Sequence, residues 1–80
     1  MSKFSEAYHK ITSTTTKMWG FEMIDPEGEW DYNPIRFNEK THELSWGDIS
    51  INVDEDCEDV NFALQGLMDA CIEAGYSNGD

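Results

Sequence analysis

The chain has 80 residues, with 17 Asp or Glu against 5 Lys or Arg, and its formal net charge at pH 7 is −12. This length suffices for one domain and is too short for two, and three Trp, three Tyr and four Phe exclude an acidic disordered tail. The charge also disfavours direct binding to nucleic acid, which is itself a polyanion. We expect one folded domain over residues 1–80.

The two signs of charge are separated along the chain. Residues 1–40 contain all five basic residues and seven acidic ones, whereas residues 41–80 contain ten acidic residues and no Lys or Arg. A charged surface that only faces water usually interleaves Lys or Arg with the carboxylates. The separation therefore predicts a basic partner.

Two cysteines, Cys57 and Cys71, are expected in the last helix, where a spacing of fourteen residues puts them about 20 Å apart. This is too far for a disulfide, and free thiols are typical of a reducing compartment. The first residues lack the apolar segment of a secretory signal, and no apolar stretch approaches the roughly 20 residues of a membrane span. We expect a cytoplasmic protein that contacts no membrane.

Residues 4–18 predict a first helix, because apolar side chains recur there at helical spacing. Ser2 is the expected N-cap and Gly20 the expected C′ residue. The Ser- and Thr-rich run at residues 12–16 has modest helix propensity, so the extent of the helix beyond Ser13 is left open.

The middle of the chain predicts an antiparallel meander. Residues 21–24 form a short run that is apolar except for Glu22, and residues 25–28 have the Asp-Pro-Glu-Gly sequence of a turn. Apolar and polar residues then alternate, and Pro34 suits an edge strand or a bulge. Residues 38–41 are the expected hairpin loop, and a strand follows from His42.

Gly47 and Asp48 allow two arrangements of the following segment. As a type II′ turn they pair Trp46 with Ile49, which keeps the apolar side chains on one face. The same register pairs Leu44 with Ile51. Alternatively, Gly47 is a bulge within one long strand, and the sheet has three strands in place of four.

The last helix has the clearest pattern. Asp56 is the expected N-cap, Asp59 the N3 residue and Gly75 the stop, while residues 77–80 are expected to fray. The predicted buried stripe comprises Val60, Ala63, Leu64, Leu67, Met68 and Cys71. The predicted fold class is α+β, an antiparallel three- to four-stranded meander flanked by an N-terminal and a C-terminal helix that both cover one face.

Acidic side chains make up the predicted partner-binding site, in three groups. The first group precedes the last helix and comprises Asp54, Glu55, Asp56, Glu58 and Asp59. The second lies on a polar row of that helix and comprises Asp69 and Glu73, with Asn61 and Gln65 in the same row. The third surrounds the first turn and comprises Asp25, Glu27, Glu29 and Asp31. Each group also suits an ordinary solvated surface, and the first supplies helix caps.

A calcium loop starting at Asp54 requires Gly at its sixth position and Glu at its twelfth. The chain has Asp59 and Gln65 at these positions, so we expect no metal site and no cofactor. His9 is expected at the surface and His42 in the sheet, and neither has a partner at a triad or metal-ligand spacing. Glycine-rich phosphate loops and Gly-x-Ser-x-Gly sequences are absent. We expect a protein without enzymatic activity.

Most of the large aromatic residues are expected in the core, namely Trp19, Trp30, Tyr32, Trp46 and Tyr76. A domain of this size rarely buries three Trp completely. One of them is therefore a candidate anchor at a binding surface, where Trp and Tyr are common.

In size and charge the whole chain resembles small acidic phage-encoded inhibitors of host defence, of the anti-restriction and anti-CRISPR type, some of which mimic DNA. It is similar in the same respect to acidic immunity proteins that block a basic nuclease site. No motif carries this resemblance, so it implies no residue roles. It implies a location in the host cytoplasm if a phage encodes the chain. The leading hypothesis is an inhibitor or modulator that occupies the basic groove of a nucleic-acid-handling protein. The alternatives are a structural or assembly subunit with a solubilising acidic surface and a divalent-metal-responsive module, and the oligomeric state is left open.

Overall fold

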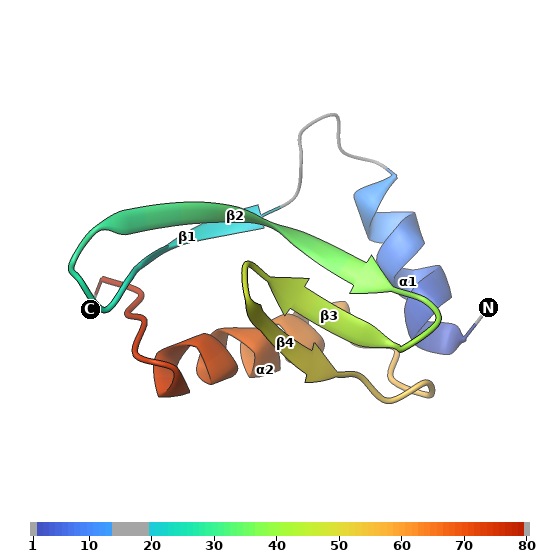
Figure 1. Cartoon of the computed structure of the whole chain (residues 1–80). Coiled ribbons are helices and arrows are strands. Elements are labelled where there is room, and N and C mark those ends of the chain that lie inside the picture. Colours follow the sequence, from blue (N-terminus) through green and yellow to red (C-terminus); the bar gives the residue numbers. More distant parts are fainter. Residues whose placement is uncertain (1, 14–19, 80) are drawn as a thin grey trace.

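The computed structural model describes residues 2–13 and 20–79. In chain order, this part contains α1 (Lys3–Thr12), β1 (Gly20–Ile24), β2 (Trp30–Asn38), β3 (Glu43–Trp46), β4 (Ile49–Asn52) and α2 (Val60–Glu73). The strands form an antiparallel meander in the order β1-β2-β3-β4, with α2 along one face and α1 beside the end of β2 (Figure 1). The predicted α+β class is confirmed, in its four-stranded form.

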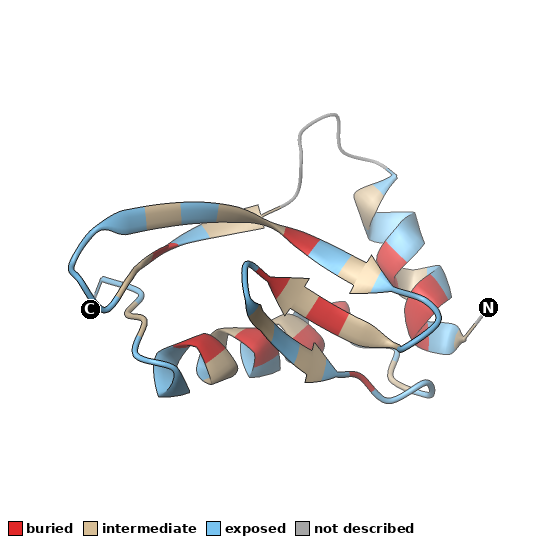
Figure 2. Ribbon diagram, in the orientation of Figure 1, coloured by how far each residue is buried: buried red, intermediate tan, exposed pale blue. Residues whose placement is uncertain are grey.

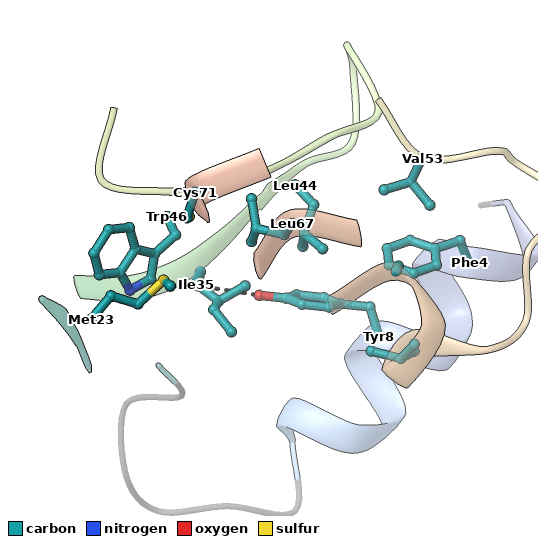
Figure 3. Close-up of a cluster of buried hydrophobic side chains, with 11 residues drawn as sticks. Phe4, Tyr8, Met23, Ile35, Leu44, Trp46, Val53, Leu67 and Cys71 are labelled. Carbon is teal, nitrogen blue, oxygen red and sulfur yellow. Dashed lines mark hydrogen bonds between the residues drawn. The ribbon is translucent and has the colours of Figure 1, made fainter. Parts of the chain in front are cut away.

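The core lies between one face of the sheet and the two helices. The register pairs Phe37 with Leu44 and Leu44 with Ile51, so these three side chains share a face. Phe4 of α1 lies edge-on to Phe37 at 5.1 Å between ring centroids, and Leu67 of α2 is fully buried. Both helices therefore pack on the same face, with buried positions alternating along β3 and recurring along the helices (Figures 2 and 3).

Trp46 joins three parts of this core. Its side chain is fully buried, and its indole N–H donates to the carbonyl oxygen of Phe21 at 2.8 Å. The ring stacks on Phe21 and meets Tyr76 edge-on, with centroids 5.2 Å away in both cases. Trp46 of β3 therefore links β1 to the segment after α2, and satisfies its polar atom while buried.

The turn at Gly47 and Asp48 has the two-residue form, not the bulge. Gly47 has a φ of 59°, and Asp48 is outside the left-handed region, which agrees with a type II′ turn. Trp46 pairs with Ile49 and Leu44 with Ile51, as the turn predicted. A loop of two residues fixes the register, so this part of the sheet could be predicted.

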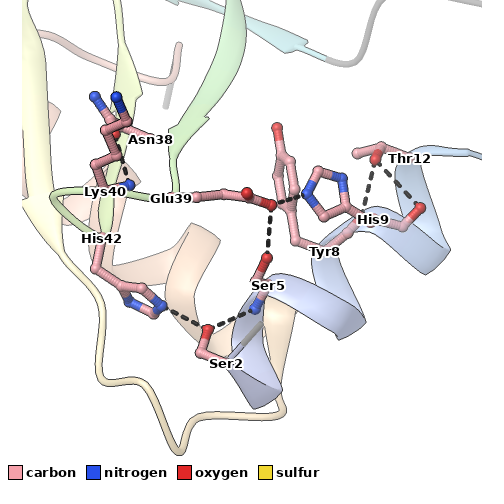
Figure 4. Close-up of polar contacts among 9 residues, drawn as sticks. All are labelled: Ser2, Ser5, Tyr8, His9, Thr12, Asn38, Glu39, Lys40 and His42. Carbon is pink, nitrogen blue, oxygen red and sulfur yellow. Dashed lines mark hydrogen bonds and ion pairs between the residues drawn. The ribbon is translucent and has the colours of Figure 1, made fainter.

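The preceding hairpin loop is displaced by one residue from its prediction. Asn38 ends β2, and the loop covers residues 39–42. The Asn38 side-chain oxygen accepts hydrogen bonds from the N–H groups of Lys40 at 2.9 Å and Thr41 at 3.2 Å (Figure 4). His42 has a φ of 61°, which no strand residue adopts, so the expectation of His42 within the sheet is wrong.

Pro34 lies where β2 changes partners. Residues 30–34 pair with β1 and residues 35–38 pair with β3, one residue to one in both ladders. Each residue of β2 therefore pairs with one neighbouring strand only, so Pro34 has an unpaired side, as the expected edge position requires, and the alternative of a bulge is wrong. Proline has no backbone N–H to donate. The place where β2 changes partners is one at which a ladder can lack a hydrogen bond.

The described ends of α1 and β1 confirm one prediction and correct another. Ser2 is the N-cap of α1, and its Oγ accepts from the N–H of Ser5 at 3.0 Å. The predicted continuation of the helix and Trp19 fall outside the described residues. Gly20 begins β1 without a positive φ, so its expected role as a helix C′ residue is wrong. A Cβ at Gly20 would lie 2.5 Å from the carbonyl oxygen of Asn33, so the approach of β1 to β2 requires glycine there.

The N-cap of α2 is Asp59, not Asp56. Cys57 consequently precedes the helix and is partly exposed, which corrects its predicted helical position, while Cys71 is buried within α2. Both thiols are free, and burial raises the pKa of Cys71. The predicted stripe of α2 is confirmed, because Val60, Ala63, Leu67 and Cys71 are buried and Leu64 and Met68 pack against the core.

Gly75 ends α2 as predicted, with a φ of 106°. The N–H of Tyr76 donates to the carbonyl oxygen of Cys71 at 3.0 Å, which is the Schellman arrangement. Beyond it, Ser77 and Ile24 exchange two backbone hydrogen bonds of 2.7 and 2.8 Å. The expected fraying is therefore wrong for Ser77, and Asp80 falls outside the described residues.

Candidate functional site

The connection between β4 and α2 contains the first predicted group, and we call residues 54–59 the acidic loop. All five of its carboxylate residues are exposed. The side chain of Asp54 accepts from the N–H of Asp56 at 2.9 Å, and that of Asp59 caps α2, so two of the carboxylates order the local backbone. The side chains of Glu55, Asp56 and Glu58 form no hydrogen bond or ion pair with any described residue and are free to meet a partner.

The second predicted group continues along α2. Asp69 and Glu73 are exposed, and α2 contains no Lys, Arg or His. At about 100° per residue, Asp69 and Glu73 share a sector of about 60° with Phe62 and Gly66. One side of α2 is therefore both acidic and, at Phe62, apolar.

The third predicted group is not brought together with the first. Its four acidic residues surround the turn between β1 and β2, which lies at the opposite end of the molecule from the acidic loop, with α2 running between the two ends (Figure 1). The molecule is 38 Å long. The predicted site is thus an elongated series of carboxylates and not one cluster.

Asp25 and Asp31 have a structural role in this turn. The Asp25 carboxylate accepts from the N–H groups of Glu29 at 3.0 Å and Glu27 at 2.9 Å, and the bond from Glu29 is the main reason that its pKa is lowered. Partial burial and a hydrogen bond with the Asp25 carboxylate raise the pKa of Asp31. The two carboxyl groups hold a proton more readily as a pair than either would as a separate surface group.

Within residues 2–13 and 20–79, the one ion pair joins His9 to Glu39 and involves none of the predicted site residues. Glu39 also accepts from the hydroxyl of Ser5 at 2.9 Å, and these two bonds, His9 first, lower the pKa of Glu39 (Figure 4). They attach α1 to the loop at residues 39–42. His9 is exposed, as predicted.

Ser2 and His42 form a pair that the sequence did not suggest. The Oγ of Ser2 lies 2.6 Å from Nε2 of His42, whose Nδ1 lies 2.7 Å from the carbonyl oxygen of Val53 (Figure 4). The carbonyl can only accept, so Nδ1 carries a proton. The backbone N–H of Ser5 donates to Ser2 Oγ, and the backbone N–H of Phe4 donates to the carbonyl oxygen of Glu55. Neither N–H is therefore free to stabilise an oxyanion. Through His42, the pair connects the start of α1 to Val53, directly after β4.

Exposed aromatic residues lie on two surfaces. Trp30 is 57% exposed and Tyr32 49% exposed, and their register positions place them on the sheet face opposite the helices. The expectation that they belong mostly to the core is therefore wrong for these two, whereas it holds for Trp46. Phe62 is 74% exposed and was not predicted as a surface residue. Its position outside the apolar stripe of α2 was the available signal.

No protein-family model matches the chain, and comparisons with curated proteins and with solved structures found no match. In the part of the chain that is described, no group of three or more His, Cys, Asp or Glu side chains is placed to hold a metal ion. The described helices include none that is long and apolar enough to cross a membrane.

Proposed function

We propose that the protein is a non-enzymatic binding protein that inhibits or modulates a nucleic-acid-handling protein by occupying its basic groove. One observation carries the proposal. The acidic loop and the exposed side of α2 present five carboxylates that pair with no cation among the described residues, namely Glu55, Asp56, Glu58, Asp69 and Glu73.

Unpaired carboxylates repel one another at a cost of about 1 kcal/mol per close pair in water. A partner rich in Lys and Arg relieves this repulsion on binding. The same field attracts such a partner over a distance, so association is fast and sensitive to salt.

The arrangement also supports mimicry of a nucleic-acid strand. Asp69 and Glu73 are one turn apart on α2, about 6 Å along its axis. The acidic groups extend over a molecule 38 Å long, close to the roughly 34 Å of one turn of duplex DNA. Two free thiols suit the reducing cytoplasm, where we place the protein and its partner.

A second candidate function is that of a structural or assembly subunit. Trp30 and Tyr32, half-exposed side by side on the open face of the sheet, favour it, because exposed aromatic pairs anchor apolar interfaces. In this case the charge serves solubility, and binding persists in about 0.5 M salt, where screening is strong.

Affinity capture from the producing cell with two matched variants tests the proposal. The first variant combines Glu55→Gln, Asp56→Asn and Glu58→Gln. The control combines Glu6→Gln, Glu22→Gln and Asp48→Asn, which removes the same charge from three separate exposed positions. We expect wild type and control to retain a nucleic-acid-binding protein that added duplex DNA or RNA releases, and the first variant to retain at least tenfold less.

Equal retention by the two variants, or a retained protein that nucleic acid does not release, would reject this function. Retention that persists in high salt and requires Trp30 would favour the assembly subunit.

A further inference from the structure

β4 is the last strand of the sheet, and no described segment pairs with its outer edge. The N–H of Val53 donates to the carbonyl oxygen of His42 at 3.0 Å, so the Val53 backbone faces the β3 side. Successive residues alternate in direction along an antiparallel ladder, so the peptide groups of Ser50 and Asn52 point outward. The edge therefore offers hydrogen-bonding groups to an added strand.

A groove of about 550 Å³ lies between this strand and α2. Ile51 and Asn52 line it from β4, Phe62 and Gly66 from α2, and Asp54 and Cys57 from the acidic loop. Because the sheet ends at β4, this part of α2 is left uncovered and Phe62 is exposed. A fifth strand, about 4.8 Å beyond β4, would place its inward side chains over Phe62 and Gly66.

Gly66 deepens the groove without being required by the fold. Glycine within a helix costs about 1 kcal/mol relative to alanine. A Cβ at Gly66 would meet only Ile51 Cδ1 within 4 Å, at 3.6 Å, an ordinary van der Waals contact. The backbone of Gly66 has no positive φ that would favour glycine. The residue is therefore explained by the space that it leaves between α2 and β4.

Charge selects the occupant of the groove. Asp54 and Asp56 line one end of it, and Asp69 follows Gly66 by about one turn on the same side of α2. A second copy of the chain would add a further charge of −12 and its own acidic loop. An extended segment rich in Lys and Arg would instead be attracted.

We infer that the groove binds an extended basic segment of a partner protein, added to β4 as a fifth strand. Apolar side chains of the segment pack on Phe62 and Gly66, and alternate Lys or Arg side chains reach Asp54 and Asp56. This inference rests on the proposed function and specifies how the basic partner is held.

Selection from a displayed library of random peptides of about ten residues, against the full chain, tests the inference. We expect selected peptides to alternate apolar residues with Lys or Arg and to shift the amide resonances of Ser50, Asn52 and Gly66. They should also slow alkylation of Cys57 by iodoacetamide several-fold. Cys71 is fully buried and serves as the unreactive reference.

Three changes separate strand addition from general attraction. Gly66→Leu fills the groove while improving helix propensity, so we expect a stable fold and at least tenfold weaker peptide binding. Asn52→Pro removes an outward N–H that the β3 ladder does not use, with a similar expected loss. Two sets of peptides, N-methylated at the odd or at the even residues, lack N–H donors on opposite edges of the added strand. Only the set methylated on the edge that faces β4 should lose affinity, which tests the pairing without altering the protein. Trp30→Ser, on the opposite face, should bind normally.

No selected peptide above background, amide shifts confined to the Trp30 face, or unchanged binding by Gly66→Leu would overturn the inference. Its failure is distinguishable from that of the proposed function. If cellular partner binding is lost in the acidic-loop variant and kept in Gly66→Leu, the groove inference is wrong and the basic-partner function stands. If both variants keep the partner, the proposed function is wrong as well.

Discussion

The side chain of Asp59 accepts a hydrogen bond from the N–H of Phe62 at 3.1 Å and so caps α2. We expect Asp59→Ala to lower the free energy of unfolding by about 1 kcal/mol, the usual cost of losing an N-cap. Asp56→Ala removes a neighbouring carboxylate that caps no helix, and should change the free energy of unfolding by less than about 0.5 kcal/mol. Urea unfolding of both variants measures this difference, and equal losses would contradict the assignment of Asp59.

The Asp25 and Asp31 pair predicts a pH-dependent stability. The raised pKa of Asp31 means that its favourable contribution is present when it is protonated and is lost as pH rises through that pKa. The lowered pKa of Asp25 has the opposite sense, so its contribution is lost as pH falls through that pKa.

We therefore expect Asp31→Asn to raise the thermal midpoint at neutral pH, because Asn can donate to Asp25 without repelling it. The gain should vanish below the ordinary carboxyl pKa of about 4, where Asp31 is protonated. Thermal unfolding across this range provides the measurement, with Glu27→Gln as a control. A gain of the same size at every pH would show that the charge of Asp31 is not its cause.

Trp46 and Trp30 predict losses of stability of very different size for the same substitution. Trp46→Phe removes the hydrogen bond to the Phe21 carbonyl and leaves space beside Tyr76, so we expect a loss of about 2–4 kcal/mol in unfolding free energy. Trp30→Phe changes a largely exposed ring and should cost less than about 0.5 kcal/mol. Denaturant unfolding followed by circular dichroism compares them. Similar losses would contradict the described core.

Gly66→Ala should stabilise the fold. The added methyl group has room against Ile51, and the helix gains the propensity of alanine, so we expect about 0.5–1 kcal/mol more unfolding free energy. A destabilised Gly66→Ala would mean that the space beside Gly66 is smaller than described. The same unfolding measurement decides between these outcomes.

Local patterns predicted the parts of the fold that depend on neighbouring residues. The Gly47-Asp48 turn set the pairing of Trp46 with Ile49, because a two-residue loop leaves little freedom of register. The N-cap of α2 could not be chosen in the same way. Asp56 and Asp59 carry the same capping group, and the predicted burial of Val60 is compatible with a helix that begins after either residue. The position of Pro34 likewise depends on the exchange of strand partners within β2, which no local pattern shows.

The candidate site was predicted in its chemistry but not in its shape. Sequence identified the carboxylates of the acidic loop and of α2, and the structure leaves all of them exposed and without a cation among the described residues. The distance between the acidic loop and the turn at Asp25 depends on the direction of α2, which only the fold defines. The groove at Gly66 arises because the sheet stops at β4, a fact of topology.

Competition for the partner's nucleic-acid site tests the central claim most directly. A labelled duplex or single strand is bound to the captured partner, and the protein is titrated in at low and at moderate salt. We predict complete displacement by wild type, weakened by salt, with the acidic-loop variant requiring at least tenfold more protein. A ternary complex in which the labelled nucleic acid stays bound, or equal displacement by that variant, would contradict the account.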